Sequence, residues 1–302
     1  MSDIKQRYQP VKKIGEGTYA VVFLGIDTVT GNTVAIKTVK MTGQSAGVEI
    51  SAVREIVFLS KIKHPNVVGL FDVRCSDGEV SLVLEYFSHN LEETIKNKNI
   101  VFSAGDIKAW LQMLLGTMAH CHSHWVLHRD LKPNNLLFNS DGVLKVADFG
   151  LAREYGLPGC KMTPRVASRW YRAPELLYGA AEYTGAADMW ACGCIFAELL
   201  LRRPFLPGST DINQLDTIFQ ALGTPRTADW PEMVDLPDYY PPQKREKPDL
   251  STLFTAATLE SLDLLNSLLA LDPKKRITAE EALRHPYFSS RPHPTLPSKL
   301  PM

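Results

Sequence analysis

Short hydrophobic runs dominate the first 90 positions, and their lengths are typical of β-strands rather than helices. These runs occupy residues 11–16, 20–27, 33–40, 70–75 and 80–86. Between the third and fourth runs, residues 47–62 carry apolar side chains at helical spacing. The pattern predicts a small N-terminal lobe with a five-stranded antiparallel sheet and one helix.

From residue 88 onward the apolar spacing is mainly helical. It predicts helices at residues 107–124, 186–201, 212–222 and 259–271. Residues 237–248 are typical of a surface loop, and the proline-rich segment after residue 292 predicts no regular structure. We therefore expect an α+β protein with an N-terminal lobe (1–87), a larger helical lobe (88–291) and a flexible tail (292–302).

The helix predicted in the small lobe has two apolar faces. At about 100° per residue, the apolar residues on the side of Glu55 are Val48, Ala52, Leu59 and Ile62. Those nearly opposite are Ile50, Val53 and Val57. A helix on the outside of a small lobe needs only one buried stripe, so the second predicts a partner surface. The alternative is a helix covered by other parts of the same chain.

Composition and charge narrow the class of protein. The 302 residues are 45% hydrophobic, enough for a substantial core, and 33 basic residues balance 33 acidic ones. Zero net charge gives no reason to expect direct binding to nucleic acid. We also expect a soluble intracellular protein, because no apolar run approaches the roughly 20 residues that cross a bilayer and no signal-peptide core is evident. Five cysteines without a zinc-like pattern predict free thiols.

The densest chemistry lies at His128–Asn135, followed by Asp148–Gly150. Asp130 can orient an attacking hydroxyl and accept its proton, and Lys132 can reach the oxygens of a transferring phosphate. Asn135 and Asp148 supply oxygen ligands of the kind that Mg²⁺ prefers, with nucleotide phosphates completing its shell. The spacing therefore indicates phosphoryl transfer from ATP to a hydroxyl.

Further elements of the same chemistry precede and follow these two motifs. Gly15–Val22 predicts two strands around a glycine-rich turn whose backbone amides can close over phosphates, with Ala20 where a third glycine is usual. Lys37 ends an apolar strand, where burial is costly unless the cation bridges phosphates and a carboxylate such as Glu55. Glu175 is expected to pair with Arg276 in a structural role.

With these motifs in order, the chain resembles a eukaryotic protein kinase over its whole length, and more narrowly a cyclin-dependent kinase. The narrower resemblance rests on Gly15–Tyr19, Ala52–Ile56 and Trp170–Glu175. It is most similar to the CDK-activating branch that serves the general transcription factor TFIIH. The residues that carry this are Ala20, Lys132–Leu137, Ser168–Trp170 and Leu199–Gly208.

The resemblance implies a bilobal protein kinase fold and a nucleotide site between the lobes. Leu84–Phe87 would form the hinge beside adenine, with Leu84 where many relatives carry an aromatic residue. The residues implied to contact ATP are Ile14, Gly15, Glu16, Gly17, Thr18, Tyr19, Ala20, Val21, Val22, Ala35, Lys37, Glu85, Phe87 and Leu137. Lys37 and Glu55 would position the phosphates, and Asn135 and Asp148 would hold Mg²⁺.

The same resemblance implies two forms of regulation. The partner of the two-faced helix would be a cyclin, and we expect Glu55 to reach Lys37 only when cyclin is bound. Thr163 corresponds to an activating phosphosite whose phosphate would gather Arg54, Arg129 and Arg153. Thr18 and Tyr19 match inhibitory phosphosites of cell-cycle relatives.

The expected function is therefore that of a nuclear cyclin-dependent serine/threonine kinase, phosphorylating the RNA polymerase II C-terminal repeats, activation loops of other kinases, or both. The implied partners are an H-type cyclin, a RING-finger assembly subunit and the TFIIH core. The nearest alternative is a cell-cycle cyclin-dependent kinase. An inactive cyclin-binding scaffold would be expected to lack one of the catalytic residues. A small-molecule phosphotransferase would need neither Thr163 nor the second helix face.

Overall fold

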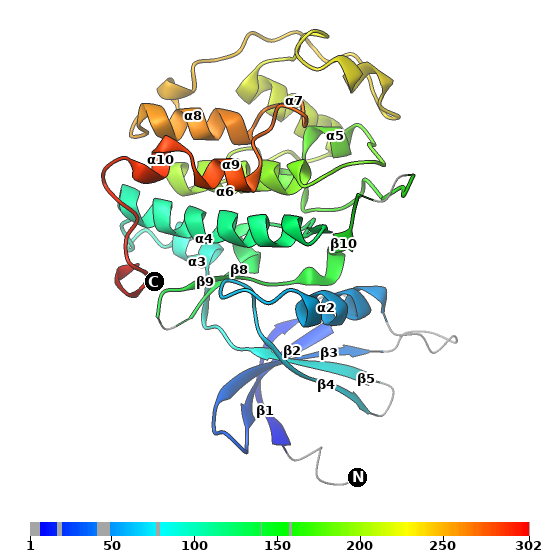
Figure 1. The fold of residues 1–302 in the computed structure, drawn as a ribbon, viewed down its shortest axis with the longest axis vertical. Coiled ribbons are helices and arrows are strands. Elements are labelled where there is room, and N and C mark those ends of the chain that lie inside the picture. The colour runs from blue at the N-terminus through cyan, green and yellow to red at the C-terminus, as the bar shows by residue number, and fades with distance from the viewer. Residues whose placement is uncertain are drawn as a thin grey trace.

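A computed structural model describes residues 7–16, 20–40, 49–76, 79–139, 141–156 and 159–301. The chain forms two lobes, a sheet-rich lobe at the N-terminus and a larger helical lobe (Figure 1). The predicted α+β class and bilobal arrangement are thereby confirmed. Among the described residues, no helix is long and apolar enough to span a membrane.

The N-terminal sheet has five antiparallel strands in the order β1-β2-β3-β5-β4. The strands are β1 (Tyr8–Glu16), β2 (Ala20–Asp27), β3 (Thr33–Lys40), β4 (Leu70–Ser76) and β5 (Glu79–Glu85). The predicted strands agree with these to within three residues at each end. In this register Lys37 of the central strand β3 lies between Val22 and Leu82.

Helix α2 (Ile50–Lys61) lies between the sheet and the helical lobe (Figure 1). Ala52 and Leu59 are buried on the same side as Glu55. Ile50, Val53 and Val57 stay 60%, 43% and 39% exposed. The two-faced pattern is confirmed for these residues, while Val48 lies outside the described residues.

The helical lobe is organised around α4 and α6, which pack against each other. Helix α6 is buried along most of its length, because its residues are apolar on all sides. The helices of this lobe are α3 (Leu91–Lys96), α4 (Ala104–Ser123), α5 (Pro174–Leu177), α6 (Ala186–Leu201), α7 (Asp211–Leu222), α8 (Leu259–Leu268), α9 (Ala279–Leu283) and α10 (Pro286–Ser289).

Side-chain caps fix several helix starts. Ser103 and Asp106 form a capping box at α4, and the Thr210 side chain accepts a hydrogen bond from the Asn213 amide at α7. All four predicted helices of this lobe are present. Helix α4 starts three residues earlier than predicted, at the capped Ala104, and α8 ends at Leu268 instead of residue 271.

Short strands and 3₁₀ turns connect the helices of the larger lobe. The strands are β6 (His89–Asn90), β7 (Val126–Leu127), β8 (Leu136–Phe138), β9 (Leu144–Val146) and β10 (Arg153–Glu154). The 3₁₀ turns are η1 (Pro133–Asn135), η2 (Phe149–Leu151), η3 (Arg169–Tyr171), η4 (Pro231–Asp235), η5 (Leu250–Thr252) and η6 (Pro297–Lys299). The loop predicted at 237–248 contains no helix or strand.

The predicted absence of regular structure after residue 292 was wrong at η6. Pro297 stands in the first turn of η6, where its fixed φ suits a helical start and its missing N–H is not needed. The segment packs on the helical lobe, since the Thr295 amide donates to the Gly105 carbonyl and Leu300 is buried.

A buried ion pair joins the end of the segment after Asp148 to the C-terminal helices. Arg276 donates from Nη1 and Nη2 to the two Glu175 carboxylate oxygens at 2.8 and 3.0 Å. Both side chains are almost completely buried, and Arg276 also donates to the Ala186 carbonyl at the start of α6. The pairing predicted for Glu175 and Arg276 is confirmed.

Replacing Glu175 by Ala should lower the free energy of unfolding by about 3–5 kcal/mol, because Arg276 would remain charged and buried without its carboxylate. Chemical denaturation followed by circular dichroism measures the change. The matched control is Arg284→Ala, which breaks the exposed Glu280–Arg284 pair and should cost no more than about 0.5 kcal/mol. Equal effects of the two substitutions would contradict this account.

Candidate active site

The loop that carries Asp130 is held by a buried aspartate of α6. The Asp188 carboxylate accepts hydrogen bonds from the backbone amides of His128 and Arg129, each at 2.9 Å, and contacts His122 Nε2 at 3.0 Å. Burial raises the pKa of Asp188, but these partners outweigh it and leave the pKa below its ordinary value. An ionised carboxylate thus fixes the backbone next to Asp130.

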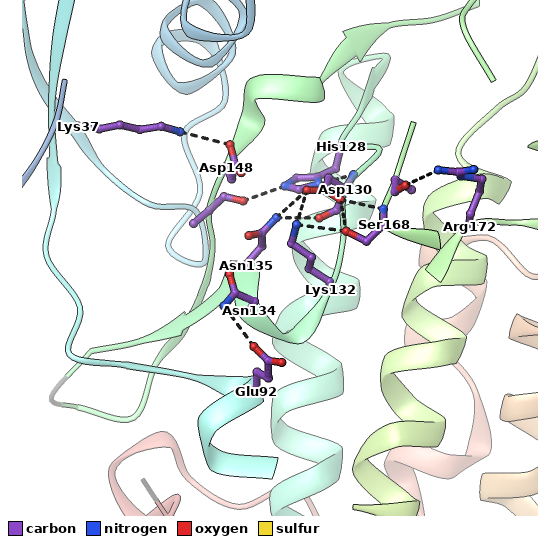
Figure 2. A network of polar contacts seen from close by, with 12 residues as sticks. Lys37, Glu92, His128, Asp130, Lys132, Asn134, Asn135, Asp148, Ser168 and Arg172 are labelled. Atoms are coloured by element: carbon purple, nitrogen blue, oxygen red, sulfur yellow. Dashed lines mark hydrogen bonds and ion pairs between the residues drawn. The ribbon is translucent and has the colours of Figure 1, made fainter. Parts of the chain in front are cut away.

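The Asp130 carboxylate receives donors on both oxygens (Figure 2). Lys132 Nζ donates to Oδ2 at 2.8 Å, while the Ser168 amide and hydroxyl each donate to Oδ1 at 3.1 Å. Lys132 also reaches the Ser168 hydroxyl at 3.2 Å. Asp130 and Lys132, which were predicted to act together, are in contact. Ser168 contacts Asp130 from a segment 38 residues further along the chain.

Asn135 and Asp148 lie near Asp130 (Figure 2). The Asn135 amide nitrogen donates to the Asp130 carbonyl at 2.8 Å, and the Ala147 amide donates to the Asn135 carbonyl at 2.9 Å. His128 Nε2 contacts the Ala147 carbonyl at 3.0 Å, which ties the residue before Asp148 to the Asp130 loop. The catalytic and metal-ligating residues predicted from two separate motifs therefore converge.

Lys37 connects the sheet lobe with α2 and with the cleft. Its Nζ lies 2.6 Å from Glu55 Oε2. It also lies 3.4 Å from Asp148 Oδ1 (Figure 2). Burial lowers the pKa of Lys37, but the charges of Glu55 and Asp148 outweigh it and raise the pKa, so the lysine stays charged. Burial also raises the pKa of Glu55.

The Lys37–Glu55 pair is already formed in the single chain. This differs from the expectation that Glu55 reaches Lys37 only when a cyclin is bound. The buried apolar stripe of α2 is the physical reason, because packing Ala52 and Leu59 inward carries Glu55 toward β3.

Asn135 and Asp148 have the donor types that suit Mg²⁺. The Asn135 amide nitrogen is occupied by Asp130, which leaves its side-chain oxygen as a ligand. The Asp148 side chain is 43% exposed to the cleft. The described residues contain no cluster of three or more His, Cys, Asp or Glu side chains able to hold a metal. A Mg²⁺ ion held by Asn135 and Asp148 would need oxygens of the substrate to complete its octahedral shell.

Apolar side chains from β1, β2, β3 and β8 are left partly exposed where a nucleotide base would lie. These are Ile14, Val22, Ala35 and Leu137. Leu84 is buried beside Ala35, its partner in the β3–β5 ladder. The Glu85 carboxylate accepts hydrogen bonds from Lys145 Nζ and from the Gly69 amide. Since this side chain is already paired, a ligand at the hinge would contact the backbone of residues 85–87.

The glycine-rich turn is only partly described. Gly15 pairs with Val22 in the β1–β2 ladder, and Glu16 pairs with Val21. Ala20 starts β2. Gly17, Thr18 and Tyr19, predicted as nucleotide contacts and inhibitory phosphosites, lie outside the described residues.

Comparison with known proteins identifies the family. The family model described as "Protein kinase domain" matches residues 8–288. The chain belongs to the protein kinase family. Cyclin-dependent kinase D-1 of Oryza sativa subsp. japonica is 52% identical over 298 residues, covering 99% of this chain and 70% of the relative. Serine/threonine-protein kinase KIN28 of Saccharomyces cerevisiae is 47% identical over 302 residues, covering 98% of each.

A solved structure gives the same result for the fold. One chain of the CAK complex from Chaetomium thermophilum bound to ATP-gamma-S has a TM-score of 0.93 and 45% identity, covering 98% of this kinase and 95% of that chain. With the relatives above, it places the kinase in the cyclin-dependent, CDK-activating branch. The resemblance drawn from sequence motifs is confirmed.

The kinase also gathers the three arginines predicted around Thr163. Burial lowers the pKa of Arg54, and the nearby charges of Arg129 and Arg153 lower it further, so the three guanidinium groups are close. Arg129 Nη1 donates to the Tyr183 hydroxyl, which donates to the Thr163 carbonyl at 2.9 Å. The Thr163 side chain is exposed beside this cluster. Tyr183 was not predicted from sequence.

Proposed function

We propose that this kinase transfers the γ-phosphoryl group of ATP to serine or threonine hydroxyls of protein substrates, as a CDK-activating and TFIIH-type kinase. The observation that carries the proposal is the convergence of Asp130, Asn135, Asp148 and Lys37 in one cleft. The solved CAK complex, which contains ATP-gamma-S, supports the nucleotide.

The roles of the residues follow from their contacts. Asp130 orients the attacking hydroxyl and accepts its proton, and Ser168 and Lys132 fix the carboxylate for that task. Lys132 and Lys37 place positive charge where the transferring group gains negative charge. Asn135 and Asp148 would hold Mg²⁺, which when bound neutralises phosphate charge. Positioning and electrostatics account for the chemistry, and no covalent intermediate with the protein is needed.

The segment after Thr163 favours a proline next to the phosphorylated residue. Ala167 has φ of +63°, a left-handed conformation that costs energy in a residue with a Cβ. Its carbonyl accepts from Arg172 Nη2 at 3.0 Å, and the Val166 carbonyl accepts from Arg172 Nε at 2.8 Å. Because Arg172 occupies both carbonyls, the backbone N–H of a substrate residue next to them would find no hydrogen-bond acceptor there. A proline at that position has no N–H and loses nothing.

This feature supports the serine-proline sites of the RNA polymerase II C-terminal repeats as substrates, together with activation loops of other kinases. A cell-cycle cyclin-dependent kinase is the alternative. By the same family correspondence we propose a nuclear location and an assembly with an H-type cyclin, a RING-finger subunit and the TFIIH core. The names of the relatives and the CAK complex support the cyclin and the multi-subunit assembly in general terms.

The exposed face of α2 is the surface that we assign to the cyclin. Ile50, Val53 and Val57 form an apolar stripe on a helix whose other face is already buried. A cyclin packed on this stripe would stabilise the position of Glu55 against Lys37. Its role is to hold an arrangement that the chain can already adopt.

The cluster of Arg54, Arg129 and Arg153 brings three positive charges together, and a phosphate on Thr163 would supply an anion for them. These three residues come from α2, the Asp130 loop and β10, so one phosphate would join both lobes through charge-assisted hydrogen bonds.

Phosphorylation of a serine-proline peptide tests the proposed function. The kinase in complex with its cyclin, supplied with Mg²⁺ and ATP, should phosphorylate a peptide of C-terminal repeats, and replacing the proline by alanine should lower kcat/KM.

Asp130→Asn should reduce turnover by about 100-fold or more, because the proton acceptor is lost while the shape is kept. Normal turnover by Asp130→Asn, or transfer to a small-molecule hydroxyl in preference to the peptide, would refute the proposal.

Val53→Glu or Val57→Glu should weaken cyclin binding by about tenfold or more, because each places a charge in an apolar contact. Isothermal titration calorimetry with the purified cyclin measures the dissociation constant. Val29→Glu, at a more exposed apolar position in the β2–β3 turn, is the control and should bind normally. Unchanged binding of both α2 variants would show that the cyclin lies elsewhere.

Thr163→Ala should lower the kcat/KM of the cyclin complex, or its stability, by about tenfold, because one charge-assisted hydrogen bond is worth about 1.5–3 kcal/mol. Peptide phosphorylation and complex dissociation are measured on protein whose phosphorylation state is fixed by mass spectrometry. Thr227→Ala, in an exposed loop of the helical lobe, is the control. If Thr163→Ala and Thr227→Ala behave alike, the phosphosite has no regulatory role.

A further inference from the structure

A second group of arginines lies on the other side of Ser168 from the metal-ligating residues. Arg169 Nε donates to Asp211 Oδ1 at 2.9 Å, and Arg172 Nη1 donates to the same oxygen at 3.1 Å. Arg165 lies close enough for its charge to act on both Asp211 and Arg172. We call Arg165, Arg169 and Arg172 the outer arginine group.

The outer arginine group carries more positive charge than its one carboxylate neutralises. Asp211 pairs with Arg169 and Arg172 and also feels the charge of Arg165, so within the described part of the chain these three arginines leave a local excess of two positive charges over this carboxylate. Burial lowers the pKa of Arg172, and the charges of Arg169 and Arg165 lower it further against the effect of Asp211. The pKa of Asp211 is lowered despite burial, because Arg169, Arg172 and Arg165 surround it.

The members of the group differ in what they are free to bind. Arg172 is largely buried and donates to the Val166 and Ala167 carbonyls as well as to Asp211, so its role is to shape the loop. Arg169 keeps 41% of its side chain exposed. Arg165 is exposed, and within the described structure its guanidinium makes no hydrogen bond or ion pair.

This group is separate from the cluster around Thr163. The charges that act on Arg54 come from Arg129, Arg153 and Glu49, whereas those that act on Arg172 come from Asp211, Arg169 and Arg165. A phosphate on Thr163 would therefore use the first cluster and leave the excess charge of the outer group in place.

The outer group lies within reach of a substrate bound at Asp130. Arg169 follows Ser168 directly, and the Ser168 hydroxyl is 3.1 Å from Asp130 Oδ1. An extended peptide advances about 3.3 Å per residue, so side chains one to three residues from the phosphorylated serine can meet Arg165 and Arg169.

We propose that Arg165 and Arg169 bind an anionic side chain of the protein substrate, one to three residues from the phosphorylated serine or threonine. The ligand is a carboxylate or a phosphate, since both match the forked geometry of arginine. The inference rests on the proposed protein kinase activity and adds a charge preference to it. Glutamate and phosphoserine peptides distinguish the two sources of the anion.

The experiment compares peptides with the kinase in complex with its cyclin. A neutral serine-proline peptide is varied by placing Glu, phosphoserine, Gln or Lys at each of the three positions on either side of the acceptor, except at the proline. At one or more of these positions, Glu or phosphoserine should raise kcat/KM over Gln by about three- to tenfold, mainly through a lower KM. The ratio should fall as salt is added.

The double variant Arg165→Gln/Arg169→Gln should bring the ratio of acidic to neutral peptide close to one. Arg165→Glu should favour the Lys peptide, an inversion that a purely structural role of the arginine would not produce. Arg284→Gln, at the C-terminal cap of α9, removes the same charge from an exposed site and should keep the wild-type ratio. A wild-type enzyme with no preference at any position, or a double variant that keeps the preference, would overturn the inference. If even the neutral peptide is not phosphorylated, the proposed function itself fails.

Discussion

The geometry of the active site depends on the ionised carboxylate of Asp188 inside the helical core. It accepts the backbone amides of His128 and Arg129 and is held in turn by His122. Arg129 has φ of +67°, so the loop carries strain that must be offset by strong contacts. Gly185 permits this arrangement, since a Cβ there would lie 2.7 Å from His122 Nδ1. The position of Asp130 is thus fixed by a residue that touches no substrate.

A second constraint acts between the lobes. Lys37 is shared by a buried carboxylate from α2 and by Asp148 of the helical lobe, so one ammonium group links the two lobes at the site and contributes to the charge there. Helix α2 buries one apolar stripe and leaves another exposed. A partner on the exposed stripe would change how often α2 occupies this position, which is a shift of population between states of the chain.

Local patterns predicted much of the fold and the main members of the site. The strands around Lys37 and the helices α4, α7 and α8 were predictable because one face of each is apolar at a regular period, and α6 because nearly all of its residues are apolar. Asp188 and Tyr183 could not be found in this way, because their roles come from contacts with residues 54 to 60 positions away. Ser168 appeared only as part of a branch motif, and nothing local indicates that it donates to Asp130. The pairing of Lys37 with Glu55 in the chain without cyclin was not predicted, because a sequence pattern does not tell how often each position of α2 is occupied.

Two separate groups of arginines lie along or next to the segment from Asp148 to Glu175. Arg129 and Arg153 face Thr163 with Arg54, whereas Arg165, Arg169 and Arg172 surround Asp211 at the start of α7. Tyr183 and Thr163 lie with the first group, and Ser168 joins the second to Asp130. Arg172 also donates to the carbonyl of the strained residue Ala167. The outer arginine group therefore helps to shape the loop proposed to favour proline, and the same group places positive charge next to that loop. In the functions proposed above, selection by shape and selection by charge would share one loop, while activation would use another set of arginines.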